Sequence, residues 1–158
     1  MKNKTILNII LFISIFALGS AYFKEYILDH QPCNLCLFER LPYFLAIIII
    51  LLGLSLNRFE KFIFISLGLI FASASILSLY HVGIEQGFFK ESLVCISNDE
   101  INSLDKEDLM KELQKKVVSC KDVQFTLLGL SLATINTIIS FILSVITFKL
   151  FLNYEKNR

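Results

Sequence analysis

Two cysteines separated by two residues, Cys33 and Cys36, are the part of this sequence best suited to chemistry. Cysteines at this spacing can close a small disulfide loop, exchange it with another thiol, or bind a metal ion. They stand just before a long apolar run, with Glu39 and Arg40 about one helical turn further along. The positive end of a helix and the charge of Arg40 would both stabilise a thiolate on Cys36. The pattern indicates a redox site at the start of an apolar helix.

The composition is that of an integral membrane protein. Hydrophobic residues make up 55% of the 158 residues, and charged residues only 18%. The charges gather at the termini and in three polar regions, and the stretches between these regions are long enough to cross a bilayer. Such a chain hides its apolar surface in lipid. The net charge of +1 argues against a nucleic-acid partner.

The apolar stretches predict an all-α fold, a bundle of four transmembrane helices that forms one integral membrane domain over residues 1–158. The expected spans cover about 5–23, 35–56, 62–80 and 123–148, with a short loop at about 24–34 and a long loop at about 81–122. A cleaved signal peptide is the alternative for the first span. Its apolar stretch is longer than the usual signal core, so we expect an uncleaved helix.

Pro42 decides where the second span begins. The run 41–56 has only 16 residues, whereas a span needs about 20. The helix either begins at Leu41 or begins near Leu35 and is kinked at the proline. The short length of the first option favours the second, which places Cys36 and Arg40 in the first turns.

The long loop carries the other two cysteines, Cys95 and Cys120. Between them, apolar residues follow helical spacing, with acidic residues first and basic residues last. This order suits the helix dipole and predicts an amphipathic helix lying on the membrane surface. A solvated loop helix fits the same pattern.

Both cysteine pairs lie on the same side of the membrane, because two spans separate them. Lysines and arginines of short loops and span ends are concentrated on the side of the two termini. The positive-inside rule therefore places both termini in the cytoplasm. All four cysteines then face outward, where disulfides persist.

Four cysteines also fit a structural zinc site or two static disulfides. The second pair, however, is separated by 24 residues and lacks the close spacing of a zinc knuckle, so we expect no metal site. A bridge between Cys33 and Cys36 would close a loop too small to stabilise the fold much. No βαβ pattern surrounds the motif, which excludes a thioredoxin-like domain. We favour a redox relay.

The stretch Cys33-Asn-Leu-Cys36-Leu-Phe-Glu-Arg40 resembles the corresponding motif of the disulfide bond formation protein B (DsbB) family. The resemblance extends in order over most of the chain. It includes Tyr80-His81-Val-Gly-Ile-Glu85, the widely spaced Cys95 and Cys120, and Gly129-Leu-Ser131 with Asn136.

The resemblance implies a thiol:quinone oxidoreductase of the bacterial inner membrane, with its cysteines on the periplasmic side. In that family, four helices hold a quinone and the second loop oxidises a periplasmic thioredoxin-fold protein. The implied redox-active disulfides are Cys33–Cys36 and Cys95–Cys120. The implied acceptor is ubiquinone or menaquinone, and the implied partner is a DsbA-like oxidase, general or dedicated to one protein.

The resemblance also implies that Arg40 holds a quinone oxygen and that His81 hydrogen-bonds or protonates the quinone. The alternatives are a snorkelling arginine paired with Glu39 and an ordinary interfacial histidine. For the whole protein, the alternative is a four-helix structural or assembly protein with inert disulfides. The vitamin K epoxide reductase class also joins this motif to quinone, but its loop cysteines precede the motif, which is the reverse of the order here.

Overall fold

The computed structural model describes residues 2–29, 31–56, 60–90, 120, 126–127 and 129–156. Cys95 and the expected loop helix lie outside the described residues. Within these ranges the chain forms four long helices and a short β hairpin. The helices are α1 (Lys2–Tyr26), α2 (Asn34–Leu56), α3 (Glu60–Glu85) and α5 (Leu132–Lys156).

All four helices are long and apolar enough to cross a membrane. Each has an apolar segment of 22 to 25 residues, and this segment contains an 18-residue stretch with a mean hydropathy of 2.0 or more. At a rise of about 1.5 Å per residue these segments match a hydrocarbon core of about 30 Å. Large apolar side chains such as Phe12, Phe16, Ile76 and Phe141 lie exposed on the helices. The chain is therefore a multi-pass membrane protein, and the predicted four-helix fold is confirmed.

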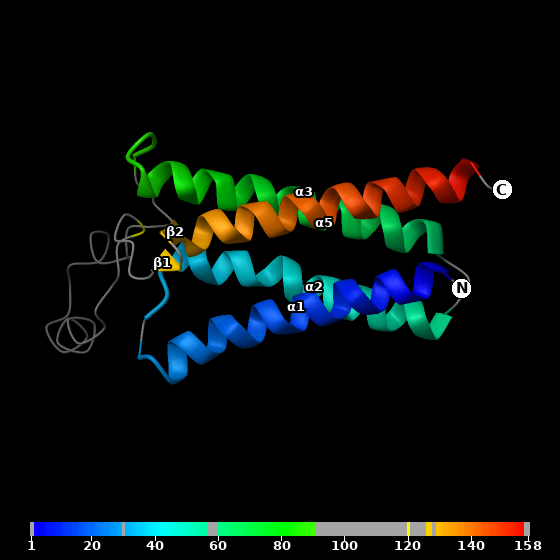
Figure 1. Cartoon of the computed structure of the whole chain (residues 1–158), viewed down its shortest axis with the longest axis horizontal. Coiled ribbons are helices and arrows are strands. Elements are labelled where there is room, and N and C mark those ends of the chain that lie inside the picture. Colours follow the sequence, from blue (N-terminus) through cyan, green and yellow to red (C-terminus); the bar gives the residue numbers. More distant parts are fainter. Residues whose placement is uncertain are drawn as a thin grey trace, which may run out of the picture.

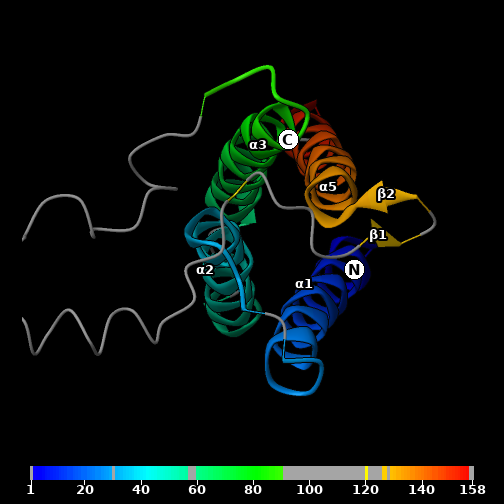
Figure 2. The same ribbon diagram turned by 90° about the vertical axis from the view of Figure 1, so that its left-hand side faces the viewer.

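The helices form one elongated bundle with both chain termini at the same end (Figure 1). Along the bundle, α3 lies against α5, and α2 contacts both α1 and α3 (Figure 2). The start of α2, the end of α3 and the β hairpin gather at the opposite end from the termini. The cysteine motif therefore lies at the end where the loops between α1 and α2 and between α3 and α5 emerge.

Close packing of α3 against α5 depends on small residues. A methyl group added to Gly68 would lie 3.2 Å from the Phe148 ring. The Ser144 hydroxyl donates a hydrogen bond to the Gly68 carbonyl oxygen across the same contact (3.3 Å). Small residues and interhelical hydrogen bonds are the usual means of joining helices in lipid. The buried core nearby comprises Leu7, Ile10, Tyr43, Ala46, Ile50, Ile63, Phe64, Leu67, Phe71 and Leu143.

The helix α2 continues through Pro42, which is the longer option and the one that the sequence favoured. Two other helix ends differ from the prediction. The helix α3 continues past the predicted end at residue 80 to Glu85, so His81 lies in the bundle and not in a loop. The helix α5 begins only at Leu132, although the sequence predicted a span from residue 123.

A β hairpin accounts for the late start of α5. Strand β1 (Thr126–Leu127) pairs antiparallel with β2 (Leu130–Ser131). Gly129 in the turn has a φ of +82°, a conformation that glycine adopts at no steric cost. The Ser131 side chain then accepts a hydrogen bond from the Thr134 backbone N–H (3.2 Å), as an N-cap residue does.

Candidate active site

Cys33 and Cys36 form a disulfide at the N-terminus of α2, with their Cα atoms 5.2 Å apart. Cys33 directly precedes the helix, and its sulfur accepts a hydrogen bond from the Cys36 backbone N–H (3.3 Å). The sulfur occupies the place that an N-cap oxygen takes in other helices. From the sequence we expected the positive end of the helix to stabilise a thiolate on Cys36. In the structure, a backbone N–H group of this helix end donates to the sulfur of Cys33 instead.

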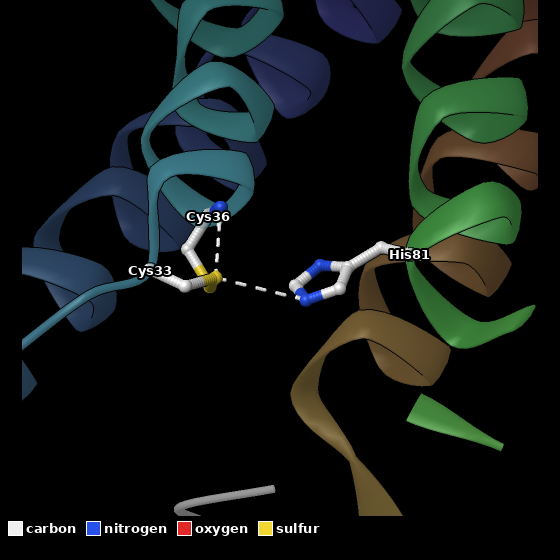
Figure 3. Close-up of side chains that lie close together, drawn as sticks. All are labelled: Cys33, Cys36 and His81. Carbon is white, nitrogen blue, oxygen red and sulfur yellow. Dashed lines mark hydrogen bonds between the residues drawn. A yellow bond between two sulfur atoms is a disulfide. The ribbon is translucent and has the colours of Figure 1, made fainter. Parts of the chain in front are cut away.

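His81 lies between the disulfide and the carboxylate of Glu39. Its Nε2 lies 3.7 Å from the Cys33 sulfur (Figure 3). Its Nδ1 lies 2.7 Å from Oε1 of Glu39. Nδ1 thus faces the carboxylate, which accepts hydrogen bonds, and Nε2 faces the sulfur. The side chain is almost fully buried, with 3% of its surface exposed. His81 thus lies inside the bundle, in contact with the disulfide.

Glu39 is held from its other side by α5. Its Oε2 accepts a hydrogen bond from Nδ2 of Asn136 (2.9 Å). The Asn136 carbonyl oxygen in turn accepts one from the Tyr43 hydroxyl (2.5 Å), which lies 3.0 Å from the Ser140 hydroxyl. We call this set, with His81, the buried polar network. It joins α2, α3 and α5 and fixes the Glu39 carboxylate against His81.

Sequence reasoning assigned no role in the site to Glu39 or Tyr43. A signal for Glu39 was present, because an ionisable residue within a membrane span is costly and marks a functional position. No comparable signal marked Tyr43. Aromatic residues are common throughout this chain, with 15 phenylalanines and five tyrosines.

Arg40 points toward α1. Its guanidinium group forms an ion pair with Glu25 and lies 5.1 Å from the centre of the Tyr22 ring. The alternative of a pair with Glu39 is wrong, because Glu39 binds His81 and Asn136 instead. Glu25 belongs to the last turns of α1, which extends to residue 26 and so includes part of the predicted short loop.

A cavity of about 370 Å³ opens beside the disulfide. Side chains from all four helices line it. The disulfide, Arg40 and His81 are part of its wall. Other polar lining residues are Lys24, Glu25, Gln31, Glu39, Glu85 and Asn136, and apolar ones include Ile13, Phe16, Ala17, Leu132 and Ile139. Its volume falls within the roughly 300–1,000 Å³ of small-molecule sites. The cavity therefore has the size of a small-molecule site and lies against the disulfide.

Cys120 is brought to the same place from far along the chain. It is 1% exposed and packs in a buried cluster with Cys33, Leu35 and Ile84. It also lines the cavity, and it is in the disulfide state. Since Cys95 lies outside the described residues, the pairing of Cys95 with Cys120 stays a prediction.

A multi-pass helical membrane protein with a buried Cys-x-x-Cys disulfide beside a ligand-sized cavity defines the class of membrane disulfide oxidoreductases. Comparison with known proteins agrees. The chain belongs to the disulfide bond formation protein DsbB family, whose sequence model matches residues 3–150. The chain is also 34% identical over 155 residues to the uncharacterized protein RP370 of Rickettsia prowazekii (strain Madrid E). That match covers 96% of this chain and 90% of the relative.

Proposed function

We propose that this protein reoxidises a periplasmic thioredoxin-fold dithiol oxidase of the DsbA type and passes the electrons to a membrane quinone. Family membership supports a disulfide-forming oxidoreductase. The observation that carries the proposal further is the contact of the Cys33–Cys36 disulfide with the cavity that Arg40 and His81 also line. We call Cys33 and Cys36 the membrane pair, and Cys95 and Cys120 the loop pair.

The proposed relay begins at the loop pair. A thiolate of the reduced partner attacks the sulfur of Cys95, so that a mixed disulfide forms and Cys120 leaves as a thiolate. Cys120 then attacks Cys33, which breaks the Cys33–Cys36 bond and releases Cys36 as a thiolate. The burial of Cys120 in one cluster with Cys33 supports this transfer.

The second half of the relay restores the loop pair. The second thiol of the partner attacks the partner's other sulfur, which is bonded to Cys95 in the mixed disulfide. This step releases the oxidised partner and the Cys95 thiolate. Cys95 then attacks Cys120, re-forms the loop disulfide and releases Cys33 as a thiolate. Two electrons have thereby moved from the partner dithiol to the membrane pair.

The side chains around the membrane pair suit the transfer of electrons from this pair to a quinone. A bound quinone would supply a two-electron acceptor, and partners near −120 mV require one that is at least comparably oxidising. Arg40 would hold a quinone oxygen at the apolar cavity. His81 would hold or deliver a proton beside Cys33, since its Nε2 faces that sulfur.

The proposed orientation places both termini in the cytoplasm and all four cysteines in the periplasm. The positive charges of the short loops and termini support it, as does the position of both termini at the end of the bundle opposite the membrane pair (Figure 1). A periplasmic location is also the one in which disulfides persist.

The test uses the purified full-length chain, a reduced DsbA-type oxidase and a soluble quinone, with quinone absorbance and partner thiols followed together. We expect one quinone to be reduced for each disulfide formed in the partner. Cys36→Ala is the matched control and should stop quinone reduction. No quinone consumption above the rate without protein would overturn the proposal and leave a structural protein with inert disulfides as the better description.

A further inference from the structure

Three side chains that favour soft metal ions lie together at the membrane pair (Figure 3). The sulfurs of Cys33 and Cys36 and a ring nitrogen of His81 lie within 4.8 Å of one another. Two of these groups come from the N-terminus of α2 and the third from α3. Thiolates and imidazole are the ligands that zinc prefers in proteins.

The separation of Cys33 and His81 matches tetrahedral coordination. With Zn–S bonds of about 2.3 Å and Zn–N bonds of about 2.0–2.1 Å, a sulfur and a nitrogen on one zinc ion lie about 3.6 Å apart. The distance from the Cys33 sulfur to Nε2 of His81 is 3.7 Å. Reduction of the disulfide frees the two sulfurs to separate and bind the same ion.

The groups behind His81 are also those of a metal site. A metal-bound histidine usually donates its second ring N–H group to a carboxylate, which fixes the ring and makes it a better ligand. Here Nδ1 of His81 lies 2.7 Å from Glu39, and Glu39 is itself held by Asn136 at 2.9 Å. Nε2 is thus the ring nitrogen on the side of the Cys33 sulfur.

We propose that the reduced membrane pair binds one soft divalent cation, Zn²⁺ or Cd²⁺, through Cys33, Cys36 and His81. Binding replaces the two thiol protons, which pass to water, and no electron moves. The disulfide form cannot bind in this way, because it holds no thiolates. All three ligand residues line the cavity.

Such an ion would inhibit turnover, because a metal-bound thiolate can neither attack a disulfide nor give up its electrons. This consequence rests on the proposed function, since reduction by the partner is what produces the dithiol during turnover. The binding itself does not depend on that function, because any reductant that opens the disulfide creates the same ligands.

The test uses the full-length chain with Cys95→Ser and Cys120→Ser, so that the membrane pair holds the only thiols. The protein is reduced, freed of reductant without air, and titrated with Zn²⁺ against a chromophoric chelator. Co²⁺ in a parallel titration reports thiolate ligation and tetrahedral geometry by its absorption. We expect one ion per reduced chain, and none at this site in the oxidised chain, which is the control with the same fold.

Variants separate the ligands from their surroundings. We expect His81→Ala to weaken binding at least tenfold, and Glu39→Gln to weaken it roughly tenfold to a hundredfold. His81→Cys should recover affinity, because it supplies another thiolate. Glu25→Gln is the matched control, since it removes a carboxylate from the cavity wall but not one bonded to His81. It should leave the affinity unchanged.

Two results would overturn the inference. One is equal metal uptake by the reduced and oxidised chains, and the other is unchanged affinity in His81→Ala. Neither measurement uses quinone or partner protein. A chain that binds zinc but reduces no quinone would refute the proposed function alone. A chain that reduces quinone but binds no zinc would refute the metal site alone.

Discussion

The replacement of Arg40 by lysine is the most direct test of how the cavity holds an acceptor. In the structure, one terminal nitrogen of the guanidinium group is engaged by Glu25, and the group lies over the Tyr22 ring. Arg40 also lines the cavity, where the other N–H groups of its planar fork would donate to a bound molecule. Lysine keeps the charge but concentrates its donors on a single nitrogen, for which Glu25 would compete with a bound molecule.

The expected size of the effect follows from the loss of one hydrogen bond to a charged group. Such a bond contributes roughly 1.5–3 kcal/mol, which corresponds to roughly a tenfold to hundredfold rise in KM for quinone. Reduction of the loop pair by the partner should stay near its normal rate, because that exchange does not involve Arg40. Quinone titrations at saturating reduced partner measure the first quantity, and rapid mixing without quinone measures the second.

A double variant sharpens the test. Adding Glu25→Gln to Arg40→Lys removes the competing anion, so part of the lost quinone affinity should return. Equal KM values for the original chain and Arg40→Lys would refute the reasoning and would assign Arg40 to the packing of α1 against α2. Lysine would then serve as well as arginine, since both side chains snorkel.

Three further predictions concern the relay and the packing around it. Cys95→Ala should abolish oxidation of the partner, while the membrane pair is still reoxidised by quinone after chemical reduction; a normal partner rate in this variant would rule out the relay. Cys36→Ser should allow a Cys33–Cys120 disulfide to be trapped and identified by non-reducing peptide mapping, and its absence after incubation with reduced partner would argue against direct transfer. Tyr43→Phe should destabilise the fold by roughly 0.6–1.7 kcal/mol in detergent unfolding, because it removes the donor to the polar network; unchanged stability would contradict that contact.

The order of the cysteines and the lengths of the apolar runs were enough to predict a four-helix membrane fold with a redox motif. Both features are local in the sequence. A run of about 20 apolar residues has few folded alternatives to a membrane helix, because lipid offers no partners for unpaired backbone groups. The Cys-x-x-Cys spacing likewise places the two sulfurs at one helix end whatever the rest of the chain does.

Helix ends were harder to predict than helices. Hydropathy alone placed His81 in a loop, because polar residues follow it closely. The structure continues α3 to Glu85 and buries His81 against Cys33 and Glu39. The last turn of α3 is stabilised by tertiary contacts of His81 with Cys33 and Glu39. A hydropathy average along the sequence does not include such contacts.

The partners of the charged residues were decided only by the tertiary structure. Glu39 and Arg40 are adjacent in the sequence and could pair on the surface of one helix, yet successive residues of a helix point about 100° apart. The bundle places α3 beside one of them and α1 beside the other. Glu39 therefore binds His81, and Arg40 binds Glu25. The sequence determined which chemical groups lie at the N-terminus of α2. The packing of four helices determined which of these groups contact one another.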